Sequence, residues 1–259
     1  MPPPPPLEIV TPITLEGSVV RLEPVRPEHA SLFFNVAKDS LEDTFRWIPY
    51  PMTTLEDFER FVARAFEEQK RGESVVFATV ERASGQVVGS TRYMNIDRVN
   101  RRVEIGSTWI APRWQRTAVN TEAKFLMLQQ AFEVWKTMRV ELKTDALNRR
   151  SRNAILRLGA KEEGMFRKHL VTHTGRVRDT VYFSILDTEW AGVKVRLGSS
   201  EERVASLWSI ALFGHCLRSL GYPATRWLVG GNSRSFASLR MTKLLGKKRE
   251  ASRESRVKP

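Results

Sequence analysis

The sequence of 259 residues has little of what several protein classes require. A single cysteine, Cys216, excludes an internal disulfide framework and a multi-cysteine zinc site. The four histidines are scattered, so no metal site is expected. No apolar run approaches the roughly 20 residues that a membrane-spanning helix needs. We therefore expect a soluble, cytoplasmic protein without a bound metal or a membrane partner, since a reducing compartment also suits the low cysteine content.

Several catalytic and targeting motifs are missing as well. The sequence contains no Gly-Lys-Ser/Thr phosphate loop, no His-Glu-x-x-His pair and no Gly-x-Ser-x-Gly elbow. These gaps argue against nucleotide hydrolysis, zinc proteolysis and serine hydrolysis. The chain opens with Met1 and five prolines in place of a basic and then apolar leader, so no secretory signal is expected.

Charge and composition divide the chain into three parts. Residues 1–14 are rich in proline and predict an extended or mobile terminus. Residues 15–197 carry the patterned segments and form the expected folded domain. Residues 198–259 hold twelve Lys or Arg against four Glu, which is +8 of the total net charge of +13. We expect a basic extension there with one helix near 204–217 and disorder beyond it. Nucleic acid is expected as a partner only through this extension.

Hydrophobic periodicity predicts strands and helices in the order β-α-α-β-β-β-α-β-α-β-β. This order favours an α/β (α+β) domain with one mixed sheet flanked by helices. Proline and aromatic residues between 41 and 54 predict an irregular loop. The expected strands are 19–22, 74–81, 87–95, 102–110, 139–144, 164–172 and 180–186, and the expected helices are 27–38, 54–69, 120–136 and 151–158.

The segment most informative about chemistry runs from Val103 to Phe132. A strand leads through a proline-containing turn and a short polar loop straight into an amphipathic helix. The first backbone N–H groups of such a helix have no intrahelical acceptor, and the helix dipole adds positive potential there. This arrangement is typical of sites that bind pyrophosphate. On spacing alone, an ordinary strand-to-helix connection explains the segment equally well.

Residues 115–120, Gln-Arg-Thr-Ala-Val-Asn, resemble motif A of the GNAT superfamily of N-acetyltransferases, commonly Gln/Arg-x-x-Gly-x-Gly/Ala. Four more stretches follow the order of the RimJ/RimL-like branch, which acetylates amino termini of ribosomal proteins. Together the resemblance covers roughly residues 13–197. The four stretches are 15–24, 47–58, 148–160 and 179–190.

The resemblance implies a strongly twisted GNAT-type sheet that is split near its centre, with acetyl-CoA as co-substrate. In this family the pantetheine arm pairs with backbone of one of the two separating strands, and motif A binds the pyrophosphate. Ala118 and Asn120 depart from the family's small residues. Ala118 fits only with a negative φ, and Asn120 is a candidate cap for the following helix. The implied cofactor-binding residues are Trp109, Ile110, Gln115, Arg116, Thr117, Ala118, Val119, Asn120, Thr121, Asn148 and Ser151.

Direct transfer to an amine needs a general base, because a primary amine is mostly protonated at neutral pH. The resemblance implies Glu104 or His169 in this role and places Ser151 near the coenzyme sulfur. Each of these residues also has a purely structural interpretation. Glu104 can be a solvated strand residue or one that is ion-paired with Arg102, and His169 can be a surface imidazole. Ser151 can be a helix cap or a first-turn residue.

Two other hypotheses remain open beside an N-acetyltransferase. One is a basic binding protein associated with RNA or ribosomes, and the other is an inactive acyl-CoA binder. The acceptor of an active enzyme is equally open among a protein N-terminus, an amino acid, a polyamine and an aminoglycoside. A homodimer is compatible with the sequence.

Overall fold

The computed structural model describes residues 5–7 and 10–198, and the extension predicted beyond 198, with its helix near 204–217, lies outside them. The described residues form one eight-stranded mixed sheet flanked by helices, which confirms the expected fold class. The elements are β1 (Leu15–Glu16), β2 (Val20–Pro24), α1 (His29–Ala37), η1 (Lys38–Ser40), α2 (Leu41–Phe45), α3 (Leu55–Lys70), β3 (Ser74–Glu81), β4 (Val87–Asp97), β5 (Arg102–Ile110), η2 (Pro112–Trp114), α4 (Ala118–Gln129), the π-helical turn η3 (Gln130–Val134), β6 (Arg139–Asp145), α5 (Arg149–Leu158), β7 (Lys161–Val171), β8 (Val177–Leu186) and a helical segment at 187–198.

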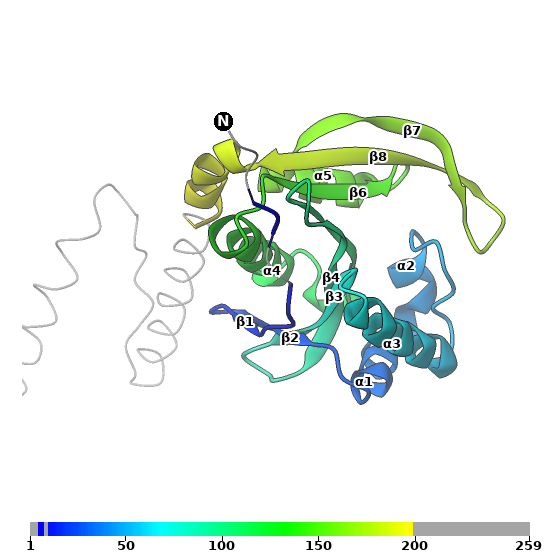
Figure 1. Cartoon of the computed structure of the whole chain (residues 1–259). Helices are drawn as coiled ribbons and strands as arrows, with labels where there is room; N and C mark the ends of the chain where they lie inside the picture. The colour runs from blue at the N-terminus through cyan, green and yellow to red at the C-terminus, as the bar shows by residue number, and fades with distance from the viewer. Residues whose placement is uncertain (1–4, 8–9, 199–259) are drawn as a thin grey trace, which may run out of the picture. The chain divides into compact units, whose positions relative to one another are not determined.

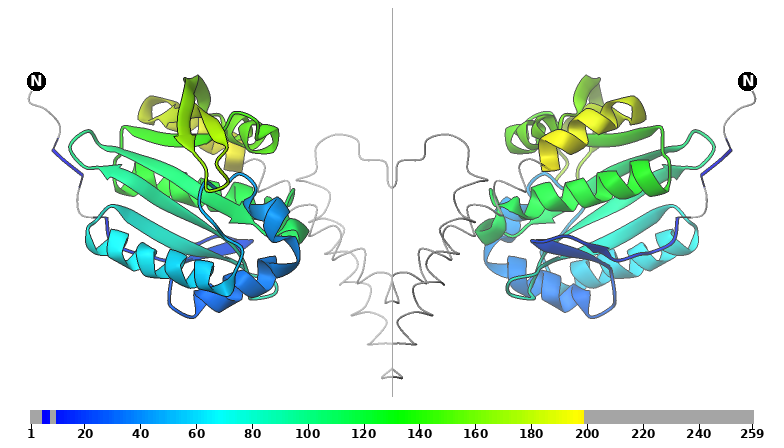
Figure 2. Two further views of the ribbon diagram at one scale, coloured as in Figure 1. Left: turned by 90° about the vertical axis from the view of Figure 1, so that its right-hand side faces the viewer. Right: turned by 90° about the vertical axis from the view of Figure 1, so that its left-hand side faces the viewer.

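The strands lie in the order β1-β2-β3-β4-β5-β6-β8-β7, and the pair β5–β6 is parallel while the other recorded pairs are antiparallel. The parallel pair needs a crossover, which α4 supplies between the two strands. In Figure 1, α1 and α3 lie on one side of β3 and β4, and α4 lies on the other. Figure 2 turns each of these two sides toward the viewer.

Two hydrophobic clusters hold these layers together. On β3, Val75 and Phe77 enter the cluster beneath α4 and α5, whereas Val76 and Ala78 enter the cluster beneath α1 and α3. Because successive strand residues point to opposite faces, a strand covered on both sides must be apolar almost throughout. This explains why β3 is buried from Ser74 to Val80.

Local signals place several boundaries. Thr54 and Asp57 form a capping box at the start of α3, with Thr54 Oγ1 accepting from Asp57 N at 3.3 Å and Asp57 Oδ2 accepting from Thr54 N at 3.0 Å. The expected irregular loop at 41–54 was wrong at its start, where Leu41–Phe45 forms the short helix α2. Phe45 anchors this helix to the core, because its ring packs on Phe58 and Trp109.

The two ends of the described domain pack onto its body. Leu7 and Val10, within the proline-rich stretch, are buried, and Leu7 N donates to Arg98 O at 3.0 Å. At the other end, Glu133 accepts hydrogen bonds from Trp190 Nε1 and Lys194 Nζ of the segment at 187–198. The Lys194 bond is the main reason that the pKa of Glu133 falls to about 2. Among the described helices, none is long and apolar enough to cross a membrane.

Candidate active site

The sheet opens where the resemblance predicts a split. Strands β5 and β6 pair only from Arg102 to Glu104 and from Arg139 to Glu141. Beyond Glu104, the described part of β6 offers β5 no ladder partner, so β5 from Ile105 to Ile110 pairs with β4 but not with β6. Because the strands are parallel, the helices that follow them, α4 and α5, both begin at the open end.

The loop before α4 has the geometry of an anion site. Arg116 adopts a left-handed φ of 61°, and Thr117 caps the helix with its Oγ1 3.3 Å from Val119 N. Gln115 closes the loop against the strand by donating its Nε2 to Ile110 O at 2.9 Å. Gln115, Arg116 and Thr117 are exposed, so the amides that begin α4 face an accessible loop.

This geometry corrects the expected role of Asn120 as a helix cap and shows how Ala118 fits into motif A. Asn120 does not cap α4; it lies in the first turn, and Thr117 is the cap. The reason is that the helix starts at Ala118, two residues earlier than the pattern predicted. Ala118 has a helical, negative φ, so its methyl group is tolerated where relatives carry glycine. Val119 is buried in the core, and Thr121 is half-buried.

The start of α5 is a second capped helix N-terminus at the open end. Asn148 caps it, with Oδ1 accepting from Ser151 N at 3.0 Å, so Ser151 is a first-turn residue and not the cap. Arg149 and Arg150 are exposed and have no ion-pair or hydrogen-bond partner among the described residues, whereas Arg152 binds Glu162 at 3.0 Å. Two unpaired arginines in the first turn oppose the helix dipole, an arrangement that a bound anion would relieve.

Trp109 and Ile110 lie in the part of β5 that has no pairing with β6, and their side chains are buried in the core. The ring of Trp109 packs edge-on against Phe33, Phe45 and Phe58, beneath α1–α3. Gly89 lets β4 approach closely, because a Cβ there would lie 2.3 Å from Trp109 O. The strand that borders the opening is therefore fixed from both its sheet neighbour and its helical layer.

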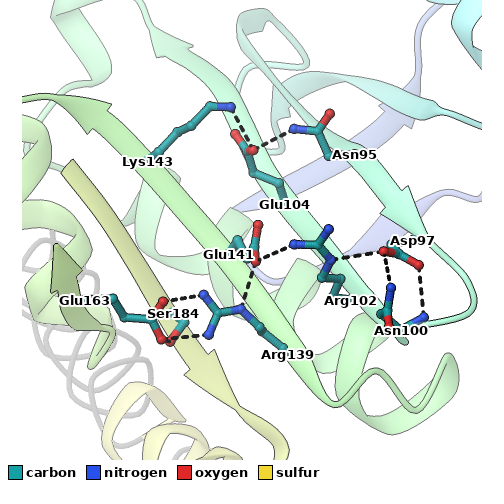
Figure 3. Close-up of polar contacts among 10 residues, drawn as sticks. All are labelled: Asn95, Asp97, Asn100, Arg102, Glu104, Arg139, Glu141, Lys143, Glu163 and Ser184. Atoms are coloured by element: carbon teal, nitrogen blue, oxygen red, sulfur yellow. Dashed lines mark hydrogen bonds and ion pairs between the residues drawn. The ribbon is translucent and has the colours of Figure 1, made fainter. Parts of the chain in front are cut away.

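Glu104 stands at the point where β5 and β6 part, and only 2% of it is exposed (Figure 3). Its Oε2 accepts from Asn95 Nδ2 at 2.8 Å and pairs with Lys143 Nζ at 3.0 Å. Its Oε1 is buried and has no hydrogen-bond partner among the described residues. The expected pairing with Arg102 was wrong: in the parallel register Arg102 reaches Glu141, at 3.2 Å, and Asp97 instead.

His169 is exposed on the edge strand β7, and the structure brings it to the same face of the sheet as Glu104. Its ring packs edge-on against Tyr182 and Phe166, with centroid distances of 5.9 and 5.4 Å. Partial burial lowers the pKa of His169, and the positive charges of Lys143 and Arg178 lower it further. The imidazole is therefore neutral at neutral pH. Ser151, by contrast, lies at the open end of the strands.

A pocket of about 1000 Å³ leads away from Glu104, past the N-terminal ends of β5 and β6. Figure 3 shows the ion pairs in its wall: Arg139 joins Glu141 to Glu163, and Arg102 joins Glu141 to Asp97. Glu104 is among the residues that line this pocket.

Comparison with known proteins accounts for this arrangement. A model of the acetyltransferase (GNAT) domain matches residues 20–161, more than half of the chain. The chain belongs to the GNAT acetyltransferase family. A GCN5-related N-acetyltransferase structure from Brucella melitensis is 34% identical, with a TM-score of 0.70 over 75% of this chain and 88% of that one.

Two further matches cover less of this chain or are less identical to it. YdaF of Bacillus subtilis (strain 168), whose name provisionally calls it a ribosomal N-acetyltransferase, is 36% identical over 110 residues, 42% of this chain. That match spans only 59% of the YdaF sequence. Mycobacterium smegmatis RimJ in complex with CoA-disulfide shares the fold at 22% identity, with a TM-score of 0.64 over 76% of this chain and 97% of that one. The expected GNAT domain is confirmed by the family model, and the likeness to RimJ shows the shared fold.

Sequence reasoning missed the two side chains that contact Glu104, which are Lys143 and Asn95. Nearby, Tyr50 donates its hydroxyl to Ser107 Oγ at 3.3 Å, beside a bulge in β5 where Ser107 has a φ of 46°. The alternation of Val140, Glu141, Leu142 and Lys143 indicated a polar face on this strand. It did not indicate which strand that face meets.

Proposed function

We propose that this chain is an N-acetyltransferase that moves an acetyl group from acetyl-CoA to a primary amine by direct attack, with residues 15–197 as its catalytic domain. One observation carries the proposal: two parallel strands separate at a buried glutamate, and the helices that follow both strands present capped N-termini at the open end. An elongated molecule with a phosphorylated end and a thioester end matches a gap of this kind.

Several described residues suit the parts of acetyl-CoA. The amide of Ala118, which begins α4, and the exposed Arg116 suit the pyrophosphate, whereas the N–H of Val119 already donates to Thr117. Arg149 and Arg150, lacking partners among the described residues, suit a further phosphate at the start of α5. The part of β5 that lacks pairing with β6, which includes Trp109 and Ile110, suits pairing with the amide-bearing pantetheine arm.

The chemistry requires two proton transfers. Glu104 is the proposed base: it takes a proton from the acceptor ammonium, which leaves a neutral amine to form the new C–N bond while the C–S bond breaks. His169, neutral at neutral pH, is a second candidate for this step. The remaining amine proton ends on the coenzyme sulfur, and Ser151, at the open end, is the proposed carrier.

The acceptor proposed first is the amino terminus of a protein. The name of YdaF and the RimJ/RimL-like resemblance support this choice. The pocket of about 1000 Å³ next to Glu104 is roomy enough for the end of a peptide.

The test is an acceptor screen with the full chain and acetyl-CoA, in which free thiol is measured. Peptides with a free amino terminus are compared with amino acids, a polyamine and an aminoglycoside. We expect thiol release with peptides and loss of at least about tenfold in Glu104→Gln, since general-base catalysis contributes about 10²–10⁴-fold. Coenzyme A that stabilises the chain without any turnover would indicate an inactive acyl-CoA binder. Salt-sensitive RNA binding without either response would indicate a binding protein.

A further inference from the structure

Two hollows of the described domain share a lining residue, Phe166. The larger is the pocket of about 1000 Å³ next to Glu104, and Phe166 stands in its wall on β7. The smaller has a volume of about 600 Å³ and is lined by residues 165–168 of the same strand. An elongated molecule that begins beside Glu104 and passes Phe166 therefore enters the second hollow.

The walls of the two hollows differ in charge. In the larger one, Arg102 and Arg139 both form ion pairs with Glu141, as Figure 3 shows. The smaller one is lined by Arg167 and Lys168 and by no carboxylate. The side chains of these two cations are exposed and have no ion-pair or hydrogen-bond partner among the described residues. The second hollow therefore attracts anionic groups.

The backbone that carries the two cations is irregular but anchored. Strand β7 pairs with β8 up to Phe166 and again from Leu170, so the register shifts across residues 167–169. Lys168 has a left-handed φ of 48°, and its N–H donates to Asp179 Oδ1 at 2.6 Å. Such a bulge re-aims the side chains that it carries. Asp179 thus holds the backbone of the bulge, while the ammonium of Lys168 stays unpaired.

The second hollow also offers apolar surface on an edge strand. Met165 and Phe166 are 49% and 54% exposed, and the ring of Phe166 packs against Tyr182 with a centroid distance of 4.6 Å. Figure 1 shows β7 at the end of the sheet, beside β8, and no further described strand covers it. Exposed edge strands with apolar side chains are typical binding places for extended peptides. RNA would also be attracted by the cations, but continuity with the pocket of an amine acceptor favours a peptide.

We infer that the acceptor is a polypeptide with acidic residues shortly after its amino terminus, and that Arg167 and Lys168 select it by binding those carboxylates. The inference rests on the proposed function and specifies its acceptor. Lys143, the ion-pair partner of Glu104, lies on β6, and two strand spacings of about 4.8 Å separate β6 from β7. The second hollow thus lies roughly 10–15 Å from Glu104, a distance that three to five extended residues cover.

The test measures acetyl transfer by the full chain to three peptides with free amino termini. The peptides differ only at their third to fifth positions, which are all glutamate, all glutamine or all lysine. We expect kcat/KM to fall in that order. Replacing Arg167 and Lys168 together by Gln should raise KM for the glutamate peptide about three- to tenfold at low salt and leave kcat unchanged, since each exposed ion pair contributes modestly. Replacing both by Glu should reverse the order of the peptides.

Lys136→Gln combined with Arg157→Gln is the matched control. It also removes one lysine and one arginine whose side chains are exposed and have no partner among the described residues. Lys136 has a left-handed φ of 56°, so the control resembles the variant at Lys168 in backbone conformation as well. The control should keep the wild-type preference. Equal kcat/KM for the three peptides, or the same loss in the control and the Arg167/Lys168 double variant, overturns the inference.

Peptide binding without acetyl-CoA separates this inference from the proposed function. Fluorescence anisotropy with peptides labelled at their carboxyl ends reports affinity without turnover. If the wild-type chain transfers no acetyl group, the proposed function fails, while tighter binding of the glutamate peptide that the double variant loses still supports an acidic partner. Single-stranded RNA that binds more tightly than this peptide, through the same two cations, would identify a nucleic-acid site and reject the inference.

Discussion

Burial of Lys124 should make the stability of this protein rise with pH above neutrality. The side chain extends from α4 into the sheet and is only 4% exposed. Its Nζ donates to Thr91 Oγ1 at 2.7 Å and to Thr108 Oγ1 at 2.5 Å. Burial lowers the pKa of Lys124 from 10.5 to about 7, because the charged ammonium loses its hydration.

The sign of the effect follows from proton counting. Below about pH 7 Lys124 is charged in the folded and the unfolded chain, so its contribution does not change with pH. Between about pH 7 and 10.5 only the unfolded chain holds the proton, and the free energy of unfolding rises by about 1.4 kcal/mol per pH unit. From pH 7 to pH 9.5 the expected gain is about 3 kcal/mol.

Lys124→Met tests this directly, since methionine fills a similar volume without a charge. Thr91 and Thr108 lose a donor but still bond each other, at 2.8 Å. Urea unfolding between pH 6 and pH 9.5 should show a rising curve for the wild type and for the control Lys194→Met, and a flatter curve for Lys124→Met. At pH 6 the variant should be at least as stable as the wild type. Parallel curves for all three chains would refute the reasoning.

Three further outcomes are expected. Glu122→Gln should lower the free energy of unfolding by about 2–4 kcal/mol in urea melts, because its buried carboxylate accepts from the backbone N–H groups of Ser18, Val19 and Val20. Replacing Arg149 and Arg150 together by Gln should weaken coenzyme A about tenfold in a titration at low salt, and unchanged affinity would remove them from the phosphate site. His169→Gln should leave the acidic limb of the pH–rate profile in place. Loss of that limb in the variant would identify the imidazole as the base.

Much of the fold follows from local patterns. The β-branched run at 102–110 has the predicted bounds, and the capping signal at Thr54 places the start of α3. The start of strand β7 was harder to predict, because its first residues, Lys161 to Gly164, are exposed and show no alternation. The strand begins three residues before the predicted start. An edge strand open to solvent on both faces leaves no hydrophobic period to detect.

The site is less predictable because its contacts join residues far apart in the sequence. Glu104 and Lys143 meet only because α4 carries the chain from β5 to a parallel β6 in one particular register. The bulge at Asn95 is equally invisible to a two-residue period, since the strand looks continuous on either side of it. Motif resemblance supplied Glu104 as a candidate, but its partners depend on strand order.

The register of β5 and β6 also explains why the wall of the pocket is so highly charged. Glu104 and Glu141 are direct partners across the parallel pair, and like charges at such positions destabilise a sheet. Each carboxylate has its own cations. Lys143 forms an ion pair with Glu104, while Arg102 and Arg139 form ion pairs with Glu141. Because Glu141 is already neutralised by two arginines, it adds little repulsion to Glu104. Glu104 thus keeps Lys143 as its own cation, while Glu141 links Arg102 on β5 to Arg139 on β6.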